Sequence, residues 1–206
     1  MDWRYITTLV TVCVITATGA AQSTLSCVYV SSEPTAEREP HPNCASRVGS
    51  AVSISKVHLS SMSFDSSGLA EVGIEHQWFY VKRDGTSLPV VDYDNGADYF
   101  SEGLVRSVRN NRIAYFDSSF KQVIAPKYDW GWPFENGRAL VCNGCQLGGQ
   151  PTDEHRFFEG GLWGYIDHDG HEVVPVNLTR SEVEALEQYN GKSSSNQRWS
   201  ERPATS

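Results

Sequence analysis

The strongest constraint on the fold of this chain is a degenerate repeat with a period of 35 residues. Tyr80 and Tyr115 are 35 residues apart, and so are Gly68 and Gly103. The phase within a unit is also kept, because each tyrosine follows its glycine by 12 residues. Units this short cannot bury an apolar face alone, so the pattern predicts that neighbouring units stack on one another.

A third unit carries an insertion. Gly137 follows Gly103 by 34 residues, but Tyr165 follows Gly137 by 28, which is 16 more than in the other units (28 − 12 = 16). We place the inserted segment at residues 142–161 and the whole repeat domain at residues 56–178.

Each unit has the pattern of three short antiparallel strands. Asp84-Gly85 and Asp169-Gly170 predict two-residue hairpin turns in which both central residues have positive φ. The central unit has Phe120 where glycine is expected, so its turn should be longer or strained. The strands that return from these turns contain prolines, which cannot donate a ladder hydrogen bond, so these strands should be edges or end near the proline. The prolines are Pro89, Pro126 and Pro175.

The predicted fold class is therefore all-β, made of degenerate repeats of antiparallel β-hairpins or three-stranded units, with one short C-terminal helix. Thr179 and Glu182 have the spacing of a capping box and predict that helix over residues 179–190. Residues 22–55 are polar and predict a tied-down loop with one strand, and the serine-rich residues 191–206 predict disorder. Whether the repeats form a sandwich, a barrel or an open solenoid stays undecided.

Aromatic residues recur in phase with the repeat, which predicts that they form the core. They are Tyr80, Tyr93, Phe100, Tyr115, Tyr128, Phe134 and Tyr165. Trp130 and Trp132 stand outside this template, because the first unit has Asn95 and Ala97 at the corresponding positions. The two tryptophans are candidates for partner binding, since tryptophan is enriched at interface hot spots, and equally for capping the core.

The last unit carries a family resemblance. The stretch Trp163-Gly164-Tyr165-Ile166-Asp167, followed by Asp169-Gly170 and Glu172-Val173-Val174-Pro175, resembles the WG repeat of bacterial exported proteins. Ile124 to Asp129 is similar to the second part of that repeat, and Phe100 to Leu104 to its third part. The resemblance covers residues 60–176 and is loose in the first unit, where Phe79 replaces the glycine. It implies a repetitive β architecture and a protein-interaction role, and it implies no catalytic residues.

The N-terminus has the layout of a secretory signal peptide. A short head with Arg4 precedes an apolar stretch from Ile6 to Ala17, and small residues follow up to Ala21. The apolar stretch is shorter than the roughly 20 residues of a membrane-spanning helix. We therefore expect residues 1–21 to be removed, no membrane insertion afterwards, and a periplasmic or secreted mature protein. A buried strand over this stretch is the alternative.

Four cysteines remain after residue 21, and an even number in an exported chain predicts disulfides. Their grouping favours the pairs Cys27–Cys44 and Cys142–Cys145. The second pair leaves two alternatives open. It could act as a thiol–disulfide redox site, although no helix can start after it, or it could bind zinc together with His155. The structural disulfide is the preferred interpretation, and no metal site, cofactor or catalytic residue is expected.

The formal net charge of -8, without any basic stripe, argues against binding to nucleic acid or to anionic membranes. The sequence thus favours an exported, non-enzymatic binding module for an unknown protein partner, and an inhibitor or neutraliser of another secreted protein is one form of that role. A redox protein using Cys142 and Cys145, or a structural envelope component, is the alternative. The sequence does not decide the oligomeric state.

Overall fold

The computed structural model describes residues 23–48, 51–149 and 157–186. The segment predicted to be a signal peptide and the segment predicted to be disordered lie outside these ranges, as does His155. The fold is built from antiparallel strands, and three sheets correspond to the three repeat units.

Each unit contributes three antiparallel strands to its sheet, and these strands have the same order in every unit. The first unit contains β4 (Leu69–Ile74), β5 (Gln77–Lys82) and β6 (Ser87–Val90). The second contains β9 (Leu104–Arg109), β10 (Arg112–Asp117) and β11 (Gln122–Tyr128), and the third contains β13 (Ala139–Asn143), β16 (Leu162–Ile166) and β17 (Glu172–Leu178). The strands β6, β11 and β17 are the edges of their sheets. Since these strands carry Pro89, Pro126 and Pro175, the predicted edge positions are confirmed.

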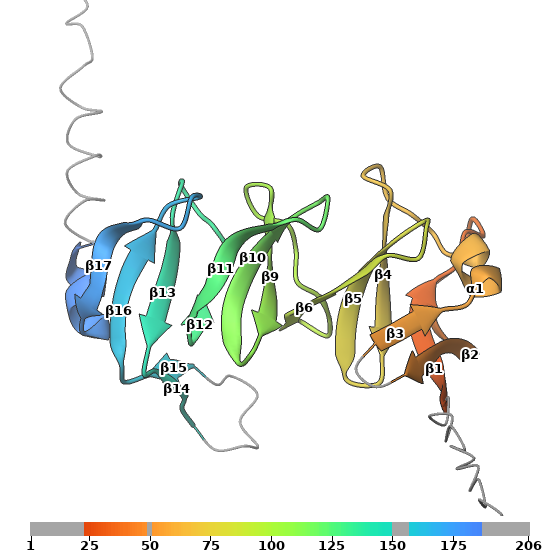
Figure 1. The fold of residues 1–206 in the computed structure, drawn as a ribbon, viewed down its shortest axis with the longest axis horizontal. Helices are drawn as coiled ribbons and strands as arrows, with labels where there is room; N and C mark the ends of the chain where they lie inside the picture. The colour runs from red at the N-terminus through yellow and green to blue at the C-terminus, as the bar shows by residue number, and fades with distance from the viewer. Residues whose placement is uncertain (1–22, 49–50, 150–156, 187–206) are drawn as a thin grey trace, which may run out of the picture.

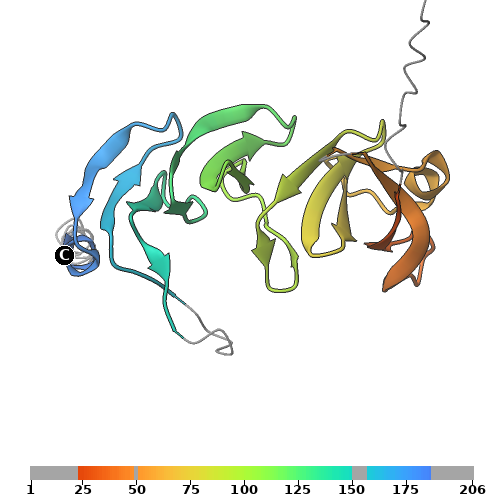
Figure 2. The same ribbon diagram turned by 60° about the horizontal axis from the view of Figure 1, so that its bottom comes forward.

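The three sheets stand side by side in a row, as Figures 1 and 2 show, so the architecture is an open stack. A hydrophobic cluster lies at each junction. Tyr80 and Leu88 of the first unit pack with Val105 and Phe116 of the second. The second and third units share a cluster that contains Tyr115, Tyr128, Phe134, Val141 and Ile166.

Additional strands extend the first sheet at the N-terminal end of the row. They are β1 (Ser23–Val30), β2 (Arg38–Val48) and β3 (Ala51–Ile54), and they are followed by α1 (Lys56–Ser61). The prediction of a loop with one strand here is wrong, because β1 pairs with the free edge of β4 and continues the ladder. The disulfide Cys27–Cys44 joins β1 to β2 with an S–S distance of 2.05 Å, and both cysteines are buried.

A helix over residues 180–186 covers the other end of the row. The Thr179 amide donates to Glu182 Oε2 at 2.7 Å, and the Glu182 amide donates to Thr179 Oγ1 at 3.4 Å, as the capping box predicted. Val183 of this helix is buried against Trp163 of the last sheet. Both ends of the stack are therefore closed by elements outside the repeat, as stacked repeats require.

The hairpin turns after β5, β10 and β16 differ from the prediction. In the turns after β5 and β16 the glycines Gly85 and Gly170 have positive φ, at 89° and 82°, while the aspartates before them do not. The loop is therefore a three-residue turn with one left-handed residue at its end, and the Gly85 amide donates to the Lys82 carbonyl at 2.9 Å. Phe120 occupies the glycine position of the central unit at φ 66°, so that turn keeps its length and is strained.

The short strands between the units form two small hairpins. β7 (Asp92–Tyr93) pairs with β8 (Gly96–Ala97), and within the insertion β14 (Gln146–Leu147) pairs with β15 (Phe158–Glu159). β12 (Trp130–Gly131) joins the third sheet beside β13. Figure 2 shows the yellow-green hairpin of β7 and β8 and the teal strand β14 projecting from the same side of the row.

Candidate functional site

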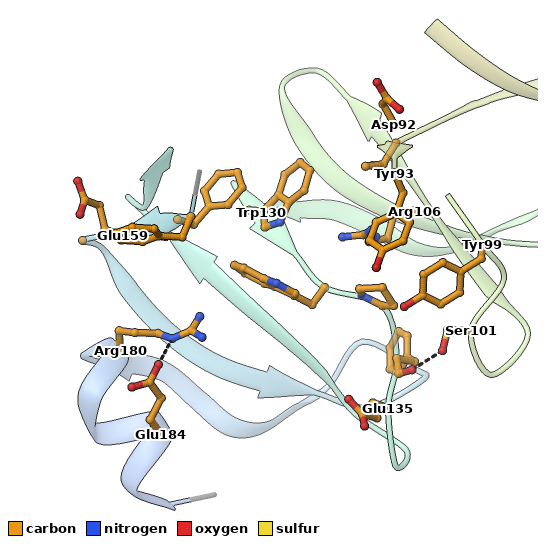
Figure 3. A pocket seen from close by; sticks show the side chains of 17 residues that line it. Asp92, Tyr93, Tyr99, Ser101, Arg106, Trp130, Glu135, Glu159, Arg180 and Glu184 are labelled. Atoms are coloured by element: carbon orange, nitrogen blue, oxygen red, sulfur yellow. Dashed lines mark hydrogen bonds and ion pairs between the residues drawn. The ribbon is translucent and has the colours of Figure 1, made fainter. Parts of the chain in front are cut away.

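A groove lies between the second and third units and is lined by aromatic side chains (Figure 3). Its volume is about 1060 Å³. The linker after the first unit, the linker after the second unit, the insertion and the C-terminal helix all contribute to it. We call it the aromatic groove, and define it by Tyr93, Tyr99, Trp130, Trp132, Phe157 and Phe158.

The exposed aromatic residues of the described chain all gather in this groove. Tyr93 is 51% exposed, Tyr99 is 45% exposed and Phe157 is 63% exposed. Every other described phenylalanine, tyrosine or tryptophan is buried or half-buried. The Tyr93 and Tyr99 rings meet edge to face, with their centroids 5.2 Å apart. Exposed apolar groups concentrated at one concave place are typical of a binding surface.

The prediction that Tyr93 belongs to the core is wrong, and the reason is a difference in strand register. In the second unit the β10–β11 pairing shifts twice, so Tyr128 at the end of β11 lies opposite Ile113 and is buried. In the first unit the β5–β6 pairing has no shift, and Val90 already lies opposite Trp78. Tyr93 is three residues beyond Val90, so it leaves the sheet and enters the exposed hairpin of β7 and β8.

Trp130 and Trp132 form the opposite wall, and both are half-buried. The Trp130 ring stacks on Phe158 with a centroid distance of 4.6 Å, and Trp132 packs against Trp163 at 5.3 Å. The Trp132 carbonyl accepts a hydrogen bond from the Tyr115 hydroxyl at 2.8 Å, and burial raises the pKa of that tyrosine. The two tryptophans thus cap the core with one face and line the groove with another.

A buried ion pair lies beneath the groove. Arg106 Nη2 is 2.7 Å from Asp98 Oδ1, and Arg106 Nη1 donates to the Gly131 carbonyl at 3.1 Å. The Arg106 guanidinium carbon lies 5.6 Å from the centre of the Trp130 ring. These contacts connect the linker that carries Tyr99 to the linker that carries Trp130, so they fix the two walls relative to each other.

The rim of the groove is acidic. Asp92, Glu135 and Glu159 are exposed, and none of them forms an ion pair with another described residue. Arg180 is the other arginine of the lining, and its Nε donates to Glu184 Oε1 at 2.6 Å. Figure 3 shows Arg180 and Glu184 at one end of the groove and Tyr93 and Tyr99 at the other, with Trp130 between.

The second predicted disulfide borders this region. Cys142 and Cys145 are bonded and both are buried, in a cluster with Trp163 and half-buried Trp130. The bond occupies both sulfur atoms, and the third predicted zinc ligand, His155, is outside the described residues. Asp167, Asp169 and His171 form the one described group with the spacing of metal ligands, but Asp167 Oδ1 there accepts the amides of Asp169 and His171 and closes the turn.

A model of the WG containing repeat matches residues 114–144 and 163–178. This chain contains WG repeats. The matched WG repeats are those of the second and third units, in which β10–β11 and β16–β17 have the same two register shifts. The unshifted first unit lies outside the match, which agrees with its Phe79 at the glycine position. No curated protein and no solved structure gave a significant match.

Of the residues that define the groove, the sequence pointed to binding only for Trp130 and Trp132, and it assigned Tyr93 to the core. Tyr99 and Phe157 lie outside the residues that match the WG containing repeat, so no periodic signal marks them. Arg106 was not singled out, although a charged residue in the middle of an apolar strand pattern is itself a signal of a buried pair. Among the described residues, no helix is long and apolar enough to cross a membrane.

Proposed function

We propose that this WG-repeat protein is an exported, non-enzymatic binding module whose aromatic groove captures a segment of another protein. The observation that carries the proposal is that the three exposed aromatic side chains of the described chain, Tyr93, Tyr99 and Phe157, all line this groove. Tyrosine and tryptophan combine a large apolar area with few rotatable bonds, so they supply much of the affinity of protein interfaces.

The scaffold supports this role because the groove walls are held rigidly. Trp130 and Trp132 pack on the core, and the pair of Asp98 and Arg106 fixes the linkers beneath them. A wall that is already in place loses little conformational entropy when a ligand binds. Export is supported by the two disulfides, which persist in oxidising compartments.

Selection from a random-peptide phage library on the immobilised mature protein tests the proposal. Enriched clones should lose binding to the double variant Tyr93→Ala/Tyr99→Ala. They should keep binding to the control Val123→Ala/Val173→Ala, which removes two exposed apolar side chains from the edge strands β11 and β17. Enrichment that fails, or clones that bind the two variants equally, would contradict the groove as the binding site.

Export is tested separately by the mass of the protein recovered outside the cytoplasm. Cleavage after Ala20 or Ala21 and the absence of free thiols are the expected results. A chain that retains its N-terminus in the cytoplasm would contradict export and leave the groove proposal to its own test.

A further inference from the structure

The C-terminal helix leads the chain to the rim of the aromatic groove. Arg180 and Glu184 both line the groove, and the last described residue, Leu186, follows Glu184 by two positions. An extended chain covers about 3.3–3.6 Å per residue, so ten further residues reach over about 30 Å. The described chain therefore ends close to the groove, and the 20 residues that follow are enough to reach into it.

The sequence of that segment complements the groove in charge. Residues 187–206 contain three basic residues, Lys192, Arg198 and Arg202, and two acidic ones, Glu187 and Glu201, and the three basic residues all follow Gly191. The rim of the groove offers Asp92, Glu135 and Glu159, which form no ion pair with another described residue. Opposite charges on two such surfaces favour their encounter and fix the register of binding.

The segment also contains the residue types that dominate interface energies. Trp199 directly follows Arg198, and both types are enriched at hot spots. An arginine placed over the exposed rings of Tyr93 and Tyr99 would gain a favourable cation–π interaction. Trp199 matches the apolar wall formed by Trp130 and Phe158, whose rings are stacked 4.6 Å apart.

We infer that the aromatic groove binds the C-terminal segment of its own chain, residues 187–206, through Arg198 and Trp199, and that this segment competes with the external partner. The inference rests on the proposed function of the groove and adds regulation to it. The partner must displace this segment from the groove. We therefore expect the groove to select partner segments that carry an arginine and an aromatic residue of their own.

The tether makes even a weak contact effective. A short flexible linker gives an effective concentration on the order of 1 mM. If the free segment binds with a dissociation constant of about 100 μM, the attached segment weakens an external ligand about tenfold. The effect needs no conformational change in the row of sheets.

A labelled synthetic peptide of residues 188–206 is the probe, and its binding to the mature chain is followed by fluorescence anisotropy. The double variant Arg198→Ala/Trp199→Ala should bind the probe about tenfold more tightly than the wild-type chain. The control variant Ser193→Ala/Ser194→Ala changes the same segment without removing charge or an aromatic ring, and it should behave as the wild type. Adding Tyr93→Ala/Tyr99→Ala to the first variant should weaken probe binding at least tenfold.

The inference is overturned if the wild type and the Arg198→Ala/Trp199→Ala variant bind the probe equally, or if neither binds it. Probe binding that survives the groove substitutions also overturns it. A concentration-dependent dimer in sedimentation velocity would show that the segment occupies the groove of a second copy, which contradicts competition within one chain. Unchanged thermal unfolding midpoints confirm that the variants are folded.

The same variants separate this inference from the proposed function. Phage selection on the Arg198→Ala/Trp199→Ala variant reports on the groove alone. Groove-dependent clones without probe binding would remove the inference and leave the proposed function standing. Probe binding at the groove without any such clones would leave the segment as the only ligand and remove the external partner.

Discussion

Asp98 and Arg106 form a bidentate ion pair that is almost fully buried beneath the aromatic groove. Arg106 Nη2 donates to Asp98 Oδ1 at 2.7 Å, and Arg106 Nε donates to Asp98 Oδ2 at 3.0 Å. The Arg106 side chain is 5% exposed and the Asp98 side chain is 0% exposed. Asp98 Oδ2 also accepts the Arg106 amide at 3.0 Å, so the carboxylate satisfies both the side chain and the backbone of its partner. The pair joins the linker after β8 to β9.

Replacement of Asp98 by alanine should strongly destabilise the protein. The substitution leaves the Arg106 guanidinium buried with the Gly131 carbonyl as its remaining acceptor in the site. An uncompensated buried charge typically costs about 3–5 kcal/mol. Urea unfolding of the Asp98→Ala variant, monitored by circular dichroism, measures the loss.

The double variant Asp98→Ala/Arg106→Met is the control for this prediction. It removes both charges and keeps apolar volume, so it should recover a substantial part of the loss. A single variant that loses less than about 1 kcal/mol would mean that water reaches Arg106, and the pair would then not fix the groove walls.

The fold could be predicted from the sequence because its signals are periodic. The 35-residue spacing of Tyr80 and Tyr115 identifies equivalent strands, and the prolines of the return strands identify the edges. The disulfides could be predicted because each pair is local in the sequence. The stack could not be distinguished from a barrel or a sandwich, because the period of the sequence does not determine how neighbouring units are oriented relative to one another.

The groove could not be predicted because a constant sequence period does not guarantee a constant register. Tyr93 and Tyr128 are 35 residues apart, yet Tyr128 is buried and Tyr93 is exposed. The first register shift in β10–β11 and in β16–β17 spans a small residue, Ala114 or Gly164, whereas Phe79 takes that position in the regular ladder of β5–β6. Because the β5–β6 ladder has no shift, its pairing ends at Val90. Tyr93 therefore lies beyond the sheet, in the wall of the groove.

Substitution of Gly164, the glycine of the WG dipeptide, should therefore destabilise the protein. A Cβ atom on Gly164 would lie 2.4 Å from the Val174 carbonyl oxygen and 2.7 Å from the Pro175 carbonyl oxygen. Because these atoms belong to the backbone of β17, the strand must move. We expect Gly164→Ala to destabilise the protein by about 1–3 kcal/mol in urea unfolding.

Gly96 offers a matched control for that variant. It is also buried and lies in a short strand, but a Cβ atom there would meet its nearest neighbour, an Arg38 guanidinium nitrogen, at 3.6 Å. Gly96→Ala should change the free energy of unfolding by less than about 1 kcal/mol. Equal effects at both glycines would contradict the close approach of β17 as the reason for the WG sequence.

Glu172 links the second and third units and should make stability depend on acidity. It lies on β17, and its pKa is lowered first by the hydrogen bond from Lys127 Nζ at 2.7 Å and then by the Val176 amide. A carboxyl group with a lowered folded-state pKa contributes stability above its ordinary pKa of 4.5, and the contribution is lost as the pH falls through the lowered value. Glu172→Gln should therefore flatten the decrease of stability below about pH 4.5.

Lys127→Met should flatten the same acid limb, because it removes the first cause of the shift. Lys56→Met is the control, since Lys56 is exposed and forms no ion pair with another described residue. Urea unfolding between about pH 3 and pH 6 measures the slopes. Parallel curves for the wild type and Glu172→Gln would show that Glu172 has the same proton affinity in the folded and unfolded chain.

In the strained turn of the central unit, Phe120→Gly should give a more stable protein than Phe120→Ala. Phe120 stands at φ 66° in the position that Gly85 and Gly170 hold in the other turns. Left-handed backbone costs a residue with a Cβ atom about 1–2 kcal/mol, and glycine avoids this cost. Both Phe120→Gly and Phe120→Ala lose the ring that lies 4.4 Å from Lys82 Nζ, so the difference between their free energies of unfolding reports the backbone effect alone.

At Phe100, which packs in the same cluster without positive φ, the alanine variant should instead be more stable than the glycine variant by about 0.5–1 kcal/mol. If alanine were the better residue at both sites, the left-handed conformation of Phe120 would not be a strained feature of this WG repeat.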